Sequence, residues 1–335
     1  MDYPISKDPP QTTYCGIDLI KFICSFLVIA IHVPPLQSVN PWIDFGIRNC
    51  FARIAVPFYF TASGFFVFRK SDLRDFSFEP SFSFSKKIFR LYGTWMTVLI
   101  FGGTGHLWYL PGAVVAVLLV SLLRLWKFSI RSIGLFSVLF YLIGTLGISY
   151  YGLIDPYRDS LLIKAYILTW DKVTVLSRGL FLGTVYIFIG MAFAYCPIHL
   201  KRWVCVSGFI TSLLLLLAEA VILNRLKISK DFYMYLSLIP ATFFLFYIAT
   251  HIHLKNSKIY GVLRILGSLI YYSHMLAYSV ASYAIRFAIS LGVSETINHS
   301  LVRYSATVLL SFVFSWVIYR LSQTKRFSWL KWIYT

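Results

Sequence analysis

Charge is scarce in this chain of 335 residues, and acidic charge is scarcer still. Only 13% of the residues are charged, and 13 Asp and Glu face 31 Lys and Arg. An ordinary soluble domain carries about 25% charged residues. Because 58% of the residues are hydrophobic and 19% are aromatic, most of the chain is expected to lie in lipid, which excludes an ordinary soluble enzyme.

Several common signatures are also missing. The sequence holds no phosphate-binding GxxxxGK[ST] loop, no HExxH, no GxSxG and no zinc-ligand spacing. The five cysteines have no metal-ligand pattern, so we expect neither a metal site nor catalytic thiols. The first apolar segment lacks a small-residue cleavage site and is therefore predicted to remain as a membrane span.

Ten hydrophobic segments are predicted to cross the membrane, most of them with the roughly 20 residues that a bilayer requires. The prediction is an all-α integral membrane protein with one transmembrane domain over residues 1–335, a polar tail at 1–16 and a basic tail at 321–335. The predicted spans are 17–34, 46–68, 88–103, 106–124, 132–151, 179–196, 203–223, 232–251, 262–290 and 302–320. Glycines 102, 103 and 105 predict a tight connection between the third and fourth spans.

The positive residues alternate with the predicted loops. With the N-terminus inside, nineteen Lys and Arg fall in inner segments and nine in outer segments. The positive-inside rule then predicts that both termini are cytoplasmic. The formal net charge of +18 is explained by this topology, so no nucleic-acid partner is expected.

The first span carries a polar stripe made of Asp18, Lys21, Ser25 and His32. Their spacing of three, four and seven residues places them on one helix face. A charge facing lipid costs roughly 3 kcal/mol, so the stripe is predicted to face protein or a wet cavity. In the alternative interpretation, Asp18 and Lys21 only mark the membrane boundary and His32 ends the helix.

Two further sets of polar residues are predicted at different depths. His32, Arg53 and His106 should meet near one outer level, which favours a polar cavity there; alternatively, each histidine is a packing residue. In the ninth predicted span, His274 lies near mid-membrane among tyrosines, and Arg286 lies nearer the outside.

A basic cluster marks the inner surface, where Lys21 is joined by Lys87 and Arg90 of the segment SKKIFRLY. Lysine and arginine hold phosphates by point charge and by bidentate hydrogen bonds, respectively. The cluster would suit a phosphorylated cytosolic donor. Contact with anionic lipid headgroups is the alternative.

Taken in order, these segments resemble the membrane acyltransferase-3 superfamily, whose members acylate carbohydrates and other acceptors in bacterial envelopes. The matching segments are GIDLIKFICSFLVIAIH, RIAVPFYFTASGFFVFRK, KKIFRLY, HLWYLPG, YIFIGMAFAY and SLIYYSHML. Two positions depart from the family pattern, because Lys21 and Lys87 stand where the family has arginine. The change keeps the charge but loses the bidentate fork.

The resemblance implies a multi-pass O-acetyltransferase of the bacterial cytoplasmic membrane, with acetyl-CoA as donor and an envelope carbohydrate as acceptor; its oligomeric state is left open. His32 would be the general base, Arg53 or His106 would stabilise the oxyanion, and Asp18 would orient Lys21. The acyl-CoA would bind to Lys21, Lys87 and Arg90. The acceptor would bind to His106, Trp108, Tyr109, His274 and Arg286.

A close branch of the same superfamily implies a different function. The membrane domain of the vancomycin-resistance serine racemases is thought to move serine, and the segment RIAVPFYFTASGFF suits that branch too. The alternative prediction is therefore a transporter of a serine-like amino acid, with the same polar stripe along the substrate path.

Overall fold

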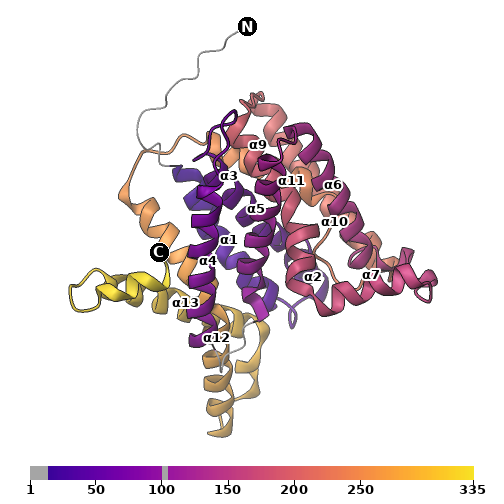
Figure 1. The fold of residues 1–335 in the computed structure, drawn as a ribbon. Helices are drawn as coiled ribbons and strands as arrows, with labels where there is room; N and C mark the ends of the chain where they lie inside the picture. The colour runs from indigo at the N-terminus through magenta and orange to yellow at the C-terminus, as the bar shows by residue number, and fades with distance from the viewer. Residues whose placement is uncertain (1–13, 100–104) are drawn as a thin grey trace.

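The computed structural model describes residues 14–99 and 105–335, which form helices and connecting turns without a strand (Figure 1). The α-helices are α1 (Cys15–His32), α2 (Pro41–Asn49), α3 (Ala55–Phe68), α4 (Glu79–Val98), α5 (Tyr109–Leu125), α6 (Ile130–Gly147), α7 (Leu161–Lys172), α8 (Thr174–Ser177), α9 (Thr184–Tyr195), α10 (Arg202–Leu226), α11 (Leu238–His251), α12 (Lys258–Ser290) and α13 (Ser300–Ser322). A π-helical segment, η5 (Arg178–Gly183), joins α8 to α9. Short 3₁₀ helices are η1 (Phe51–Ile54), η2 (Gly105–Trp108), η3 (Tyr151–Leu153), η4 (Asp155–Tyr157), η6 (Glu295–Asn298) and η7 (Ser328–Ile333).

Within residues 14–99 and 105–335, seven helical segments are long and apolar enough to cross a membrane by length and composition, as in a multi-pass membrane protein. They are Cys15–His32, Pro41–Phe68, Gly105–Leu125, Ile130–Gly147, Val175–Tyr195, Arg202–Leu226 and Ser300–Ser322. The other three predicted spans correspond to α4, α11 and α12, which do not reach that standard. The number of spans and the side of the termini therefore remain predictions.

The third and ninth predicted spans differ from the helices that occupy them. α4 begins at Glu79 rather than at residue 88, because Pro80 suits the first turn of a helix and Ser81 bonds Ser121 of α5 across 2.7 Å. Positions 102 and 103 of the predicted tight connection lie outside the described residues. α12 is continuous over 33 residues, about 50 Å, and exceeds the roughly 30 Å hydrocarbon core; in Figure 1 its end extends below the bundle.

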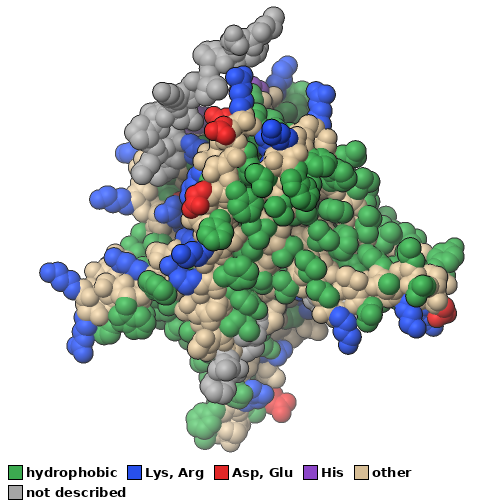
Figure 2. All heavy atoms as spheres, viewed as in Figure 1, with side chains coloured by type: hydrophobic (Ala, Val, Ile, Leu, Met, Phe, Trp, Pro, Cys, Tyr) green, Lys and Arg blue, Asp and Glu red, His purple; other side chains and the backbone are tan. Residues whose placement is uncertain are grey.

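The apolar surface matches a lipid environment. Figure 2 shows hydrophobic side chains spread across the face over α5 and α6, with Lys and Arg mainly at its periphery. Exposed apolar residues on α6 include Leu135, Leu139 and Ile143, and on α10 they include Ile210 and Leu214. Soluble proteins rarely expose so much contiguous apolar area, so these faces are suited to acyl chains.

Glycines bring α3 and α9 into close contact at the centre of the bundle. A Cβ added at Gly190 would overlap the carbonyl oxygen of Thr61, and one added at Gly64 would overlap that of Ile187. Small residues allow helices in membranes to approach backbone to backbone. This contact fixes the position of α3, which carries residues of both cavities described below.

We expect Gly190→Val to lower the melting temperature of the detergent-purified protein, because overpacking of a tight core typically costs about 1–3 kcal/mol. Gly93→Val is the matched control, since Gly93 also lies within a helix but has open space where the Cβ would stand. Equal melting temperatures for the two variants would contradict the close α3–α9 contact.

Candidate functional site

Two cavities approach each other inside the bundle. The inner cavity, named for the predicted orientation, has a volume of about 550 Å³ and lies beside Lys21 between α1, α3, α4 and α12. The outer cavity has a volume of about 290 Å³ and lies beside His32. Lys21 and His32 are eleven residues apart on α1, about 16 Å along its axis. The polar stripe of α1 therefore contributes Lys21 to the inner cavity and His32 to the outer cavity.

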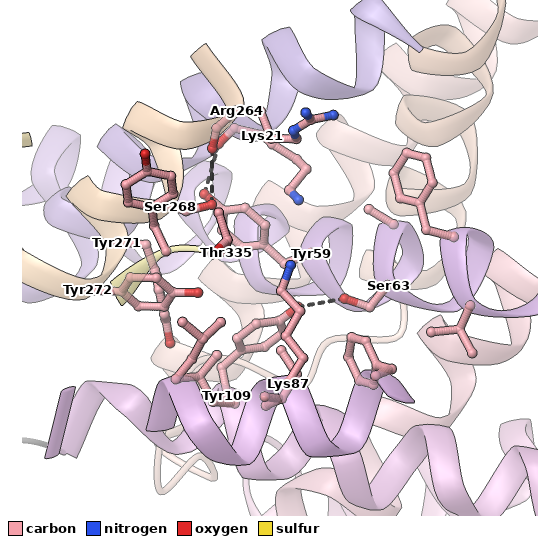
Figure 3. Close-up of a pocket in the computed structure, with 18 of the residues that line it drawn as sticks. Lys21, Tyr59, Ser63, Lys87, Tyr109, Arg264, Ser268, Tyr271, Tyr272 and Thr335 are labelled. Carbon is pink, nitrogen blue, oxygen red and sulfur yellow. Dashed lines mark hydrogen bonds between the residues drawn. The ribbon is translucent and has the colours of Figure 1, made fainter. Parts of the chain in front are cut away.

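The inner cavity is basic. Lys21 and Lys87 point into it from opposite sides (Figure 3), and Lys70 and Arg264 also line it. No acidic residue lines it within the described part of the chain. The carboxylate of Asp18 pairs with Arg264 across 3.6 Å, and its role in orienting Lys21 stays a prediction. The inner cavity is therefore suited to a group with negative charge.

Four predicted site residues lie outside the linings of both cavities, namely Asp18, Arg90, His274 and Arg286. The guanidinium of Arg90 lies 4.7 Å from the ring centre of Trp332 in η7 and not among the residues of the inner cavity. Arg286 is exposed and lies over Tyr283, one turn earlier on α12, at 4.7 Å. Arginine readily stacks on aromatic faces, and helix spacing alone does not reveal such a partner.

The outer cavity contains several of the predicted residues. His32, Arg53, His106 and Trp108 line it together. Nη2 of Arg53 donates to Oδ1 of Asn49 across 3.0 Å. The expectation that these groups meet at one level is met by the geometry, although their chemical roles remain a prediction.

Three imidazole rings gather beside the outer cavity. The ring centres of His106 and His274 are 4.6 Å apart, and those of His32 and His274 are 5.3 Å apart. His32 is exposed to the cavity, whereas His274 is fully buried and its Nδ1 contacts the carbonyl oxygen of Tyr271 at 2.8 Å. The cluster is not arranged as metal ligands, since the described residues hold no group of three potential ligands that could bind an ion.

Three tyrosines separate the cavities, and we call Tyr59, Tyr109 and Tyr271 the tyrosine partition. Their ring centres are 5.8 to 5.9 Å apart, and Tyr109 and Tyr271 line both cavities. Sequence reasoning included Tyr109 through the segment HLWYLPG and missed the role of Tyr59. The sequence did contain a signal for Tyr59. It lies in the matched segment RIAVPFYFTASGFFVFRK, one helical turn before Ser63, so both side chains are expected on the same helix face.

Each phenol of the partition is held by a hydrogen bond. The hydroxyl of Tyr59 donates to the carbonyl oxygen of Lys21 across 2.8 Å. That of Tyr271 donates to the carbonyl oxygen of His106 across 2.8 Å. The Tyr109 hydroxyl and the Ser63 hydroxyl lie 3.0 Å apart (Figure 3). These bonds tie the partition to residues of both cavities.

Sequence reasoning missed Arg178, Asp231 and Tyr233, which also line the outer cavity. Arg178 was counted only as an outer topology charge, yet it begins the π-helical segment η5, and such segments are frequent at functional sites. Its guanidinium lies 4.8 Å from the ring centre of Trp108. Asp231 and Tyr233 belong to the connection between α10 and α11, whose position depends on the tertiary structure.

A matched pair of cysteines would test the separation of the cavities. Val56 and Ser63 share a face of α3 two turns apart, but Val56 lines the outer cavity and Ser63 the inner one. In a cysteine-free background, we expect an impermeant thiol reagent applied to intact cells to label Val56→Cys and to spare Ser63→Cys. Permeabilised cells should show labelling of both. Labelling of both variants in intact cells would mean that the partition does not close the path.

Comparison with known proteins finds similar proteins that are named as amino-acid racemases. The chain is 27% identical over 334 residues to an amino-acid racemase of Enterococcus faecalis, covering 91% of this chain and 45% of that protein. It is 31% identical over 212 residues to another amino-acid racemase of Enterococcus faecalis, covering 54% and 29%. It is 29% identical over 259 residues to a serine/alanine racemase of Enterococcus gallinarum, covering 69% and 36%. The chain spans less than half the length of each of these relatives.

No family model and no solved structure matches the chain. The resemblance to the acyltransferase-3 superfamily as a whole therefore rests on its motifs, whereas the relatives support the racemase-associated branch. The expectation of an O-acetyltransferase is wrong on this comparison, because the relatives are named amino-acid racemase and serine/alanine racemase. Acetyl-CoA as donor and an envelope carbohydrate as acceptor were not tested and stay predictions of that superseded interpretation.

Proposed function

We propose that this chain moves a small neutral amino acid of the serine and alanine class across the membrane. The observation that carries the proposal is the pair of cavities that meet at the tyrosine partition. A transporter needs a site reached from one side at a time, with a thin barrier that can shift. The names of the racemase relatives supply the substrate class.

The partition is thin enough to act as such a barrier. Val56 and Ser63 are separated by about 10 Å along α3 and already line different cavities. Each phenol is held by one hydrogen bond to the neighbouring structure, and a single protein hydrogen bond contributes only about 1 kcal/mol net. Rearrangement of one or two rings therefore lies within the energies of ordinary μs–ms motions.

The charges along the path also suit an amino acid. A zwitterion carries two charges that are costly in lipid, so each must meet a protein group on its way. The outer cavity offers arginine, histidine and aspartate side chains. The inner cavity offers Lys21, Lys87 and Arg264, which would attract the carboxylate after it passes the partition. Among the described residues there, the ammonium group would meet only neutral side-chain oxygens, such as the hydroxyls of Ser63 and Ser268.

Purified protein in liposomes should take up labelled L-serine in a saturable manner, and excess L-alanine should compete with that uptake. Val56→Trp should reduce uptake because the added ring fills the outer cavity, whereas Arg286→Gln, outside both cavities, should leave uptake unchanged. If correctly folded wild-type protein gives no uptake above protein-free liposomes for either amino acid, the proposal is wrong.

Substitution of His32 should show whether this residue acts as a hydrogen-bonding group or as a base that removes a proton. A transporter needs a hydrogen-bonding group at this position, and glutamine supplies one at similar bulk. We expect His32→Gln to retain most of the L-serine uptake and His32→Ala to lose roughly tenfold, the effect of about 1.4 kcal/mol. Melting temperatures would show whether the alanine variant is folded. Equal loss in both folded variants would contradict a hydrogen-bonding role.

A further inference from the structure

The outer cavity contains charges of both signs that are only partly matched within the protein. Arg53, Arg178 and Asp231 are its charged lining residues, apart from the histidines. Nη2 of Arg53 lies 3.5 Å from Oδ1 of Asp231. Among the described side chains, no carboxylate lies within ion-pair distance of Arg178. The cavity therefore has one positive charge in excess, at Arg178.

Aromatic rings hold the guanidinium of Arg178 in place. Its Cζ lies 4.8 Å from the ring centre of Trp108 and 5.3 Å from that of Tyr233. Its Nε is buried without a hydrogen-bond partner. Aromatic faces orient an arginine without neutralising its charge. Such an arginine is prepared to bind a carboxylate through its remaining N–H groups.

Asp231 offers the opposite charge in the same cavity. Its side chain is 50% exposed, compared with 14% for Arg53. Oδ1 accepts a hydrogen bond from the backbone N–H of Phe232 across 2.6 Å and is also the oxygen nearest Arg53. Within the described residues both contacts use Oδ1, which leaves Oδ2 available to an ammonium group.

We propose that the outer cavity is a recognition site for the zwitterionic head of an amino acid, in which Arg178 binds the α-carboxylate and Asp231 binds the α-ammonium group. The proposal rests on the transport function proposed above and assigns its substrate site. The volume of about 290 Å³ lies at the small end of ligand pockets. The apolar side chains of Val28, Ile31 and Val56 in the same lining favour a short, uncharged substrate side chain.

Two analogues of L-serine separate the two contacts. Glycerate has a hydroxyl in place of the ammonium group, and serinol has a hydroxymethyl group in place of the carboxylate. Binding of all three ligands is measured on the full, detergent-purified chain by calorimetry, with thermal shift as a second readout. The variants are Arg178→Gln and Asp231→Asn, and Arg286→Gln is the control because Arg286 is exposed outside both cavities.

We expect Arg178→Gln to weaken the binding of L-serine and glycerate by roughly tenfold to hundredfold, the range for hydrogen bonds to charged groups. The affinity for serinol should be unchanged. Asp231→Asn should weaken L-serine and serinol and leave glycerate unchanged. Arg286→Gln should bind all three as the wild type does. This crossed pattern cannot arise from a general loss of cavity shape, which would weaken every ligand alike.

Three results would overturn the site: no L-serine binding by folded wild-type protein, unchanged L-serine affinity in both cavity variants, or equal weakening of all ligands. The site and the transport function can also fail separately. If L-serine uptake persists undiminished in Arg178→Gln, the proposed recognition site is wrong and the proposed transport function is retained. If the two variants lose affinity for the expected ligands but the wild type shows no uptake, the recognition site is retained and the transport function is wrong.

Discussion

The contact among Tyr59, Tyr109 and Tyr271 is the interaction on which the rest of the site depends. Three rings with centres 5.8 to 5.9 Å apart divide what would otherwise be one polar channel. The backbone groups that hold two of them belong to Lys21 and His106, and these residues line different cavities. A movement of the rings would therefore change the walls of both cavities. A transporter that opens to one side of the membrane at a time would need this kind of coupling.

The scaffold explains why the partition lies on α3. Gly64 and Gly190 let α3 and α9 touch backbone to backbone, so α3 is fixed while side chains on its opposite face remain at a cavity wall. Val56 and Ser63, two turns apart, then face separate spaces. A rigid helix beside the tyrosine partition would concentrate any rearrangement in the side chains rather than in the bundle, where close packing resists gradual deformation.

Helical periodicity was sufficient for the polar stripe of α1, but it did not locate every residue of the site. The spacing of Lys21 and His32 placed both on one face of α1, and the approach of His106 to His32 followed from depth alone. Arg178 and Asp231 could not be found this way, because a π-helical turn and an irregular connection have no simple period. Arg90 and Arg286 were assigned to sites by depth, but each guanidinium stacks on an aromatic ring instead. Depth limits where a charge can be, and only side-chain packing decides which way it points.

The resemblance to an acyltransferase superfamily shows why motifs alone did not decide the chemistry. Lys21, His32, Arg53 and His106 all belong to the matched segments, and the same residues would line either an acyl-transfer site or a transport path. A fold can host several functions, and function must be argued from the site itself. The residues that discriminate are therefore those outside the motifs. Arg178 and Asp231 offer opposite charges in one small cavity, an arrangement that a zwitterion needs and that a carbohydrate hydroxyl does not.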